Sequence, residues 1–402
     1  MNFEFDMLQT IAIATVVLLV GSVIRNQSSY LTKYTIPNPV IGGVFFSLLS
    51  LVGYSTGAFF FDFDTTLQDV FMTVFFTAVG FSSNIKAFGR AGKIGLQLVA
   101  VIILIIIIEN ILGVTLASIF NLDPLLGLST GSAALIGGHG TSAAFGPIFE
   151  DLGATSASTV ALASATFGLV IGGVVGGPIG HYLMKKHKLS HHSNERNDNG
   201  DHYNVDDSDS TESTRFSEKK LFTASYQIIL AMGIGTVISY LLESIGLTFP
   251  AYIGGLLMGL IIRNVGEYSG KFDVPMREIN TMGEIGLSLF VSMALMTLEL
   301  WELADLAIPM IVILLIQIIV LILFLIFIAF RLLGKNYDAA VMITGVTGFG
   351  LGAMPTAVVN MEAFSSKYIP SPTAFFAITA IGSLAIDISN SLLLTFFMNI
   401  VS

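Results

Sequence analysis

Long apolar runs separated by short polar loops dominate this chain. A transmembrane helix needs about 20 predominantly apolar residues, and the runs approach or exceed that length. The pattern therefore predicts an all-α integral membrane protein made of two halves, 1–184 and 221–402, with five transmembrane helices each. The predicted crossings lie near 7–24, 39–57, 69–84, 94–120 and 158–184 in the first half, and near 223–244, 250–264, 283–303, 307–332 and 372–400 in the second.

Two glycine-rich segments do not fit a spanning helix. They lie at about 125–146 and 341–358, each just before the last crossing of its half. Clustered glycine either lets helices pack closely or lets the backbone leave helical geometry. Irregular backbone at membrane depth is tolerated where it is buried in protein or lines a cavity. We therefore expect two re-entrant loops, with close-packed helices as the alternative.

Residues 185–220 separate the halves and are almost free of apolar side chains, which predicts a solvated linker. Elsewhere the composition supports a membrane protein, because 53% of the residues are hydrophobic, 11% are charged and the mean hydropathy is +0.81. The chain has no cysteine, so disulfides and thiolate sites are excluded. Most of the six histidines fall in the linker at irregular spacing, so no metal site other than one for Na+ is expected.

The basic residues predict the orientation. When the ten runs are threaded through a membrane, all 18 Lys and Arg residues fall on one side, and the opposite loops contain acidic residues such as Asp62, Glu150 and Glu302. By the positive-inside rule, the linker is cytoplasmic and both termini are external. Because each half has an odd number of crossings, the halves are expected to have opposite orientations in a bacterial inner membrane.

A weak internal repeat agrees with two inverted halves. TIPNPVIGG at 35–43 is echoed by LTFPAYIGG at 247–255, and ATFGLVIGG at 165–173 by AIGSLAIDI at 380–388. Each second motif begins 212 to 215 residues after the first. One such echo is expected by chance in glycine-rich apolar sequence, whereas several in the same order favour an inverted repeat of the kind found in secondary transporters.

The glycine-rich segments supply the candidate substrate-binding residues. Helix N-termini at a break present free N–H groups and a positive dipole end, which suit a carboxylate. A threonine hydroxyl can add a donor or instead bond to its own helix, and a histidine can bind substrate, carry a proton or be structural. The candidates are Gly137, Gly138, His139, Gly140, Thr141, Gly350, Gly352 and Thr356.

Asp387 is the candidate sodium ligand, because it lies well inside the last apolar run. A charged side chain there costs at least ~2.5 kcal/mol, so it needs a partner. Hard cations prefer oxygen ligands, and the nearby Asn390 and Ser383 can supply them. A protonated, hydrogen-bonded aspartic acid is the alternative. Glu109, beside Asn110, is either proton-sensitive or a structural contact.

Six runs along the chain form an ordered set: KYTIPNPVIGG at 33–43, GGHGT at 137–141, ATFGLVIGG at 165–173, LWELADLAIPM at 300–310, GKNYDAAV at 334–341 and GFGLGAMPTA at 348–357. Through these runs, nearly the whole chain resembles the bacterial sodium:glutamate symporters. The resemblance implies sodium-coupled uptake of L-glutamate, two inverted five-helix halves with re-entrant loops of opposite access, and a homodimer with an elevator-like motion. It also points to Asp387 and Asn390, and it implies no cofactor beyond Na+ as the coupling ion.

The expected function is therefore sodium-coupled transport of glutamate by alternating access, with glutamate, Na+ and membrane lipid as partners and no nucleic acid. A proton- or sodium-coupled transporter of another carboxylate, such as a 2-hydroxycarboxylate, is the alternative, with His139 or Glu109 as the proton carrier. A channel is disfavoured because strings of pore-lining charge are missing. An enzyme is disfavoured because no converging nucleophile, base or metal ligands are apparent.

Overall fold

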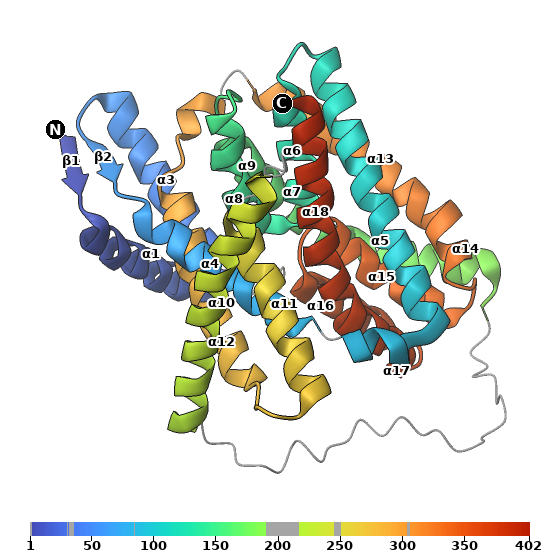
Figure 1. Ribbon diagram of the computed structural model, residues 1–402. Coiled ribbons are helices and arrows are strands. Elements are labelled where there is room, and N and C mark those ends of the chain that lie inside the picture. The colour runs from blue at the N-terminus through green and yellow to red at the C-terminus, as the bar shows by residue number, and fades with distance from the viewer. Residues whose placement is uncertain are drawn as a thin grey trace.

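The computed structural model describes residues 2–29, 31, 36–83, 85–189, 217–244, 251–303 and 306–402. Within these ranges, the side chains of residues 85–91, 242–244, 251, 380, 383 and 384 are outside the description. Most of the predicted linker, 190–216, also lies outside the described residues. The described chain is almost entirely helical (Figure 1).

The helices form two groups, which we call the panel and the bundle. Neighbouring helices within each group make most of the tertiary contacts, and α8 and α18 of the bundle touch α12 and α4 of the panel. Figure 1 shows the panel toward the left and the bundle toward the right. The panel contains α1 (Met7–Gln27), α3 (Asn38–Thr56), α4 (Thr66–Ser82), α10 (Glu218–Ser244), α11 (Ala251–Ser269) and α12 (Met276–Met296).

The bundle holds the long helix α5 and both glycine-rich segments. Figure 1 shows α5 and α18 running along its height, with the short helices between them. The bundle helices are α5 (Ile85–Ile119), α6 (Pro124–Thr130), α7 (Ser132–Leu135), α8 (Gly138–Asp151), α9 (Ala157–His187), α13 (Ala307–Phe324), α14 (Phe330–Leu332), α15 (Tyr337–Gly350), α16 (Met354–Ser365), α17 (Pro372–Phe376) and α18 (Ser383–Val401). π-helical turns at Leu325–Ala329 and Ala377–Gly382 precede α14 and α18.

Each of the ten predicted crossings coincides with helical residues. Seven of the described segments are long and apolar enough to cross a membrane, namely Met7–Gln27, Asn38–Thr56, Gly92–Ile119, Ala157–His187, Glu218–Leu241, Met276–Met296 and Ala307–Leu332. The chain is therefore a multi-pass membrane protein. The other predicted crossings correspond to α4, α11 and α18, of which α4 and the end of α18 are shorter apolar helices.

α11 and α12 are two of the helices whose boundaries differ from the sequence-based expectation. The crossing expected near 250–264 is α11, which continues to Ser269, so Arg263 lies within the helix and pairs with Glu267 one turn later at 2.5 Å. The crossing expected near 283–303 is α12, which begins at Met276 and ends at Met296. In both cases polar residues extend the helix beyond the apolar run, because helix formation does not require apolar side chains at the ends.

Equivalent glycines join two pairs of panel helices, α1 with α3 and α10 with α11. A β-carbon on Gly42 of α3 would overlap the backbone of Val17 of α1, and one on Gly254 of α11 would overlap the backbone of Gly235 of α10. Small residues allow this close approach of backbones, which is how helices associate in lipid. The neighbouring glycines contact the remaining panel helices in a matching way: Gly43 faces Leu295 of α12, and Gly255 faces Thr77 of α4.

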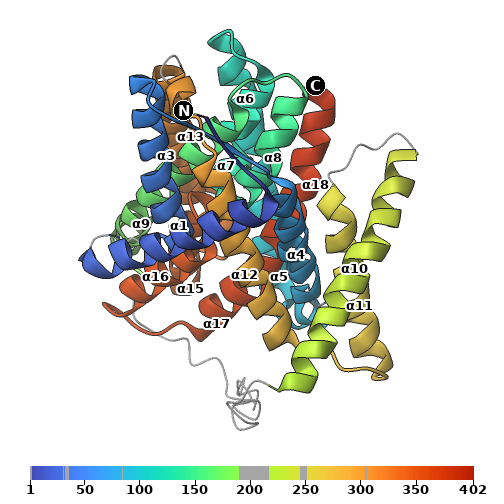
Figure 2. The ribbon, with the colours of Figure 1, turned by 90° about the vertical axis from the view of Figure 1, so that its left-hand side faces the viewer.

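A short parallel ribbon joins the N-terminus to the α3–α4 connection. β1 (Asn2–Phe5) pairs with β2 (Phe60–Phe63), and the stacked rings of Phe5 and Phe63 lie 5.2 Å apart. The sequence analysis did not anticipate these strands, because each has four residues and no turn signal links them. Figure 2 shows α1, which follows β1, lying across α3 and α12 at a large angle.

The bundle core is built from the apolar faces of α5, α13 and α15. Leu98, Ile102 and Ile105 of α5 are fully buried against residues such as Leu314 of α13 and Ile343 of α15. The side chains of this core exclude water from the irregular backbone beside it. The core therefore positions the two places, one in each glycine-rich segment, where the helix is interrupted.

Candidate functional site

The first glycine-rich segment is a helix broken twice. Asp123 caps α6 by accepting the Leu125 N–H at 2.8 Å. The helix stops at Gly131, whose ψ of −137° is not helical, and the short α7 follows. The chain breaks again before α8, where Gly138 has φ +60°. A side chain rarely adopts that φ, so glycine at 138 allows the turn into α8.

Helix α7 is held between two asparagines from distant helices. Asn110 of α5 accepts from both the backbone N–H of Ser132 at 3.1 Å and its hydroxyl at 2.8 Å. Asn390 of α18 donates to the carbonyl oxygen of Ser132 at 3.1 Å. All three side chains are buried. The Asn110 bond satisfies the Ser132 N–H, which has no helical partner after the break. The Ser132 carbonyl also accepts from the Gly137 N–H at 2.9 Å, so the Asn390 bond is an additional link between α7 and α18.

The hydrogen bonds of Asn110 predict that replacing this residue lowers the stability of the protein. Asn110→Ala removes the acceptor of a buried N–H and a buried hydroxyl, so we expect a loss of about 1–3 kcal/mol of stability. Thermal unfolding of the purified protein measures this loss. Ser132→Ala is the matched control, since it removes the hydroxyl and keeps the backbone bond, and it should cost less than Asn110→Ala. If Ser132→Ala lost as much stability as Asn110→Ala, or more, the bond from the Ser132 N–H to Asn110 would not stabilise the break.

The second glycine-rich segment is a pair of closely packed helices. Asn336 caps α15 by accepting the Ala339 N–H at 2.8 Å. After α15 the backbone becomes extended at Ala353, and α16 begins at Met354. A β-carbon on Gly348 would lie 2.5 Å from the Cα of Ala357, so the two helices approach too closely for a side chain there. Asn360 of α16 donates to the carbonyl oxygen of Gly172 in α9 at 3.0 Å.

The two breaks meet. A β-carbon on Gly138 would lie 2.8 Å from the carbonyl oxygen of Gly352. The beginnings of α8 and α16 therefore lie close together, with α9 alongside, since Gly168 of α9 abuts the backbone of Leu351. Helix N-termini carry free N–H groups and a positive dipole end. Two such ends within one buried region can bind an anion without a basic side chain.

The predicted substrate residues divide between this meeting point and other contacts. Gly138 and Gly352 face each other there. Thr141 and Thr356 are buried in the first turns of α8 and α16. A β-carbon on Gly137 would lie 2.7 Å from the amide nitrogen of Asn390, so this glycine faces α18.

Three other predicted residues point away from the meeting point. A β-carbon on Gly140 would contact Leu287 of α12 at 3.3 Å, and one on Gly350 would contact Leu321 of α13 at 3.5 Å. His139 lies 3.0 Å from the Thr166 hydroxyl of α9 through Nε2. Because that hydroxyl donates to a carbonyl of its own helix, it accepts from His139, which assigns the proton to Nε2.

The candidate sodium ligands lie along α18 between the two breaks. Asp387 is half-buried, and Asn390 is 1% exposed with an amide oxygen that has no hydrogen-bond partner in the described part of the chain. Asp387 and Asn390 are three residues apart and share a helix face. One turn before Asp387, a β-carbon on Gly382 would lie 3.7 Å from Met354 of the second break. The side chain of Ser383 is outside the described residues.

Glu109 is buried beside Asn110 on α5. Its side chain is 1% exposed, and neither carboxylate oxygen has a hydrogen-bond partner among the described residues. An uncompensated charge is costly at such a position. Of the two expectations for Glu109, a proton-sensitive group and a structural contact, the placement favours the proton-sensitive group, because the described residues offer the carboxyl no hydrogen-bond partner.

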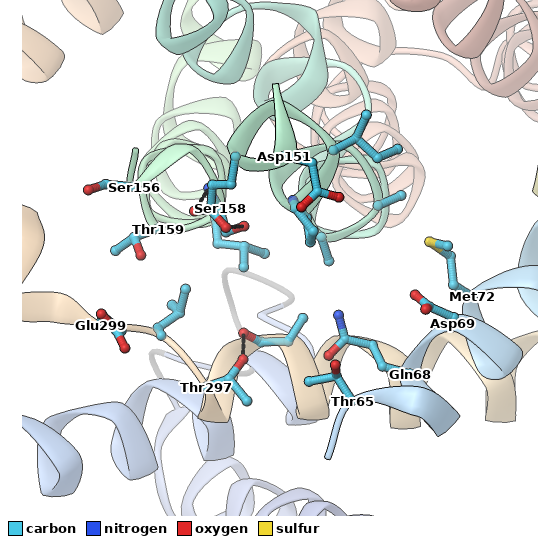
Figure 3. Close-up of a pocket in the computed structure, with 18 of the residues that line it drawn as sticks. Thr65, Gln68, Asp69, Met72, Asp151, Ser156, Ser158, Thr159, Thr297 and Glu299 are labelled. Carbon is cyan, nitrogen blue, oxygen red and sulfur yellow. Dashed lines mark hydrogen bonds between the residues drawn. The ribbon is translucent and has the colours of Figure 1, made fainter. Parts of the chain in front are cut away.

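A cavity of about 920 Å³ opens between the panel and the bundle beside α8. Its wall includes Ala143 and Ala144, which follow Thr141 within the next turn of α8. Figure 3 shows residues of α4, the end of α12 and the α8–α9 region facing one another across it. The cavity therefore brings an open space to within about one helical turn of the first break.

The sequence analysis missed three polar residues that hold this region. They are Asn110, Asn360 and Thr166, whose partners lie on other helices. Asn110 and Asn360 are polar residues within buried helix faces. A polar residue at such a position is the sequence signal that could have identified them. The sequence does not name their partners, because the contacts join residues far apart in the chain.

Comparison with known proteins finds one family over nearly the whole chain. The family model described as sodium/glutamate symporter matches residues 3–370. The sodium/glutamate symporter of Escherichia coli (strain K12) is 38% identical over 399 residues, covering 98% of both chains. That of Haemophilus influenzae (strain Rd) is 35% identical over 395 residues, covering 98% of this chain and 97% of its own. A solved structure of the sodium proton antiporter MjNhaP1 from Methanocaldococcus jannaschii covers 97% of this chain and 96% of its own, at 17% identity and a TM-score of 0.46.

Proposed function

The chain belongs to the sodium/glutamate symporter family, and we propose that it carries L-glutamate into the cell together with Na+. The family match confirms the resemblance found in the sequence, and it places the chain among transporters rather than enzymes. The observation that carries the proposal is the meeting of the two helix breaks at Gly138 and Gly352. It supplies a place for an anionic substrate inside a membrane protein.

In this proposal a glutamate carboxylate binds the N-termini of α8 and α16. No Lys or Arg occurs in 131–141 or 350–356, so backbone N–H groups and helix dipoles supply the positive end. The hydroxyls of Thr141 and Thr356 lie in the first turns of the same helices and can add donors. Gly138 and His139 at the start of α8 are buried, and there such interactions are stronger than in water. At the start of α16, Met354 is half-buried, Pro355 is exposed and Thr356 is buried.

Sodium binds near Asp387 in the same proposal. The carboxylate of Asp387 and the amide oxygen of Asn390, which makes no hydrogen bond with any residue the structure describes, are oxygen ligands of the kind a hard cation prefers. Asn390 also holds Ser132, so a cation at its oxygen would contact the residue that positions the first break. Because glutamate enters as an anion, more than one Na+ per cycle is required before the membrane potential assists, at about 2.3 kcal/mol per charge per 100 mV.

We infer that the two halves, 1–184 and 221–402, are inverted repeats with one re-entrant segment each. Matching contacts support this, since α1–α3 and α10–α11 pack through equivalent glycines, and Gly43 and Gly255 face α12 and α4 in turn. In Figure 1 both termini lie toward the upper end and α10 starts at the lower end. With the basic linker 185–220 in the cytoplasm, both termini are external in a bacterial inner membrane.

The division into panel and bundle suits alternating access. Both breaks and the proposed sodium ligands belong to the bundle, so an elevator-like movement of the bundle along the panel carries the whole site across the membrane. The glycine-packed panel is the stationary part of this scheme, and it is the part expected to form the homodimer. These assignments rest on the family resemblance together with the contacts described above.

Uptake of radiolabelled L-glutamate into proteoliposomes tests the function. An inward Na+ gradient should drive accumulation well above equilibration, and a matched K+ gradient should not. Undiminished accumulation without a sodium gradient would contradict sodium coupling. A pH gradient in sodium-free buffer forms the second arm, in which accumulation would favour a proton-coupled carboxylate carrier that uses Glu109 or His139.

A further inference from the structure

We propose that the cavity between the panel and the bundle is a second, external binding site for Na+, separate from the site proposed at Asp387. The proposal deepens the proposed function, because it assigns the place where the coupling ion is collected before it reaches the breaks. It rests on the charges around the cavity, on the amide oxygen of Gln68, which has no hydrogen-bond partner among the described residues, and on the position of the cavity beside α8.

Carboxylates from both sides of the cavity face a shared space. Asp69 comes from α4, Glu150 and Asp151 from the end of α8, and Glu299 and Glu302 from the segment after α12. Figure 3 shows Asp69, Asp151 and Glu299 on different sides of the opening. None of the described residues that line the cavity is Lys, Arg or His. A concave wall of one charge sign concentrates ions of the opposite sign.

Gln68 adds an amide oxygen that has no hydrogen-bond partner within the part of the chain that the structure describes. Its side chain is 7% exposed and lines the cavity, and its amide oxygen makes no hydrogen bond with any described residue. Figure 3 shows the amide directed into the cavity beside Thr65 and Asp69. Because a half-turn of the amide exchanges its oxygen and nitrogen, the oxygen can be presented to a cation beside Asp69. A buried polar group without a partner is costly unless a ligand or water satisfies it.

The carboxylates influence one another across the cavity. Burial, and then the neighbouring carboxylates of Glu302 and Glu150, raise the pKa of Glu299 above its usual value. The same negative field attracts a cation. Glu150 is partly committed elsewhere, because it accepts from the backbone and hydroxyl of Ser158 at 2.8 Å each and so caps the start of α9.

The arrangement suits a monovalent ion better than a tightly chelated divalent one. Among the described residues, no group of three or more His, Asp or Glu side chains converges as metal ligands do. Carboxylates spread around a wall of this size hold a partly hydrated ion that exchanges readily. The same wall repels an anion, so sodium in the cavity also eases the approach of glutamate to the first break.

The test removes two cavity charges that cap no helix. Glu299→Gln with Glu302→Gln should raise the half-saturating Na+ concentration for glutamate uptake on the order of fivefold at constant ionic strength in choline chloride. The half-saturating glutamate concentration at saturating Na+ should not rise. Direct binding of 22Na+ to the purified protein without glutamate should weaken in the same variant. Unchanged sodium dependence and unchanged 22Na+ binding would overturn the proposal.

Glu4→Gln with Asp62→Asn is the matched control. These two exposed carboxylates are paired in the β1–β2 ribbon and do not line the 920 Å³ cavity, so the control makes the same change in net charge near the same end of the molecule. If both double variants raised the half-saturating Na+ concentration equally, the cause would be general attraction of Na+ to the negative surface. That result would overturn the proposed cavity site. If the unaltered protein failed to transport glutamate, the proposed function would fail, and the 22Na+ comparison would still decide the cavity.

Discussion

Asp387→Asn is expected to abolish sodium-driven accumulation of glutamate while leaving a folded, membrane-inserted protein. Asn keeps the shape of the side chain and one carbonyl oxygen but removes the charge. A unit charge pair at 4 Å is worth about 4 kcal/mol at an effective dielectric of 20, so the sodium affinity should fall at least about 100-fold. Proteoliposome uptake measured over a series of Na+ concentrations gives this result directly.

The same variant separates the two interpretations of Asp387. If the residue were a protonated aspartic acid with a structural role, the uncharged amide would replace it with little effect. If it is the sodium ligand, charge is essential, and Asp387→Glu should retain part of the activity. Ser389→Ala on the same turn of α18 is the control for any change in that helix, and it should transport at near the normal rate. Normal sodium dependence in Asp387→Asn would move the ion site elsewhere.

Gly138→Ala is expected to reduce transport by at least tenfold. The substitution places a β-carbon 2.8 Å from the carbonyl oxygen of Gly352 and imposes a left-handed backbone on an alanine. The backbone conformation alone costs roughly 1–2 kcal/mol. The contact with Gly352 must also be relieved, and relief separates the two helix starts that the proposed glutamate site requires. The initial rate of glutamate uptake at saturating Na+ is the measurement.

Gly57→Ala is the matched control for Gly138→Ala. Gly57 ends α3 with a φ of +67°, close to the +60° of Gly138, and a β-carbon there meets nothing within 4 Å. It carries the same backbone cost without the contact. We expect a slightly lower melting temperature in Gly57→Ala and normal transport. If both variants lost transport in proportion to their loss of stability, the contact between Gly138 and Gly352 would have no specific role in glutamate binding.

The helices were predictable from the sequence because the apolar runs are long and uninterrupted. α1 and α13 follow their runs closely, since lipid leaves a buried backbone few alternatives to the helix. α5 begins nine residues before its predicted run and is kinked at Gly92. The breaks fall within the two glycine-rich segments predicted at about 125–146 and 341–358, because glycine adopts backbone conformations outside the helix, as at Gly131 and Gly138. α11 and α12 show the limit, since polar residues extend or shift their ends.

The arrangement of the site was less predictable. Gly137, Gly138 and Gly140 belong to one motif, yet they face α18, the second break and α12 in turn. A helical turn points successive residues in different directions, so a motif does not imply a shared contact. The β1–β2 ribbon escaped notice for a related reason. Its two strands are short and lie far apart in the chain, and short-range pattern carries no signal for such pairing.

Contacts between residues of the two halves could not be predicted from the sequence. The first break is held by Asn390 of the last helix, and the second break is held against Gly172 of the first half. The sequence contains these asparagines but not the distance between them and their partners. An internal repeat indicates equivalent elements, and it does not say that each half completes the other.

This mutual dependence has a consequence for the order in which the protein is made. The ribosome delivers α7 long before α18, and Asn390 lies near the very end of the chain. Until α18 enters the bilayer, the carbonyl of Ser132 lacks one of its partners. In a nascent or truncated chain ending after α9, the Ser132 carbonyl would keep its bond from the Gly137 N–H and lack the one from Asn390, so nothing from the second half would hold α7. The first half therefore reaches its final arrangement only after the last helix has been inserted beside it.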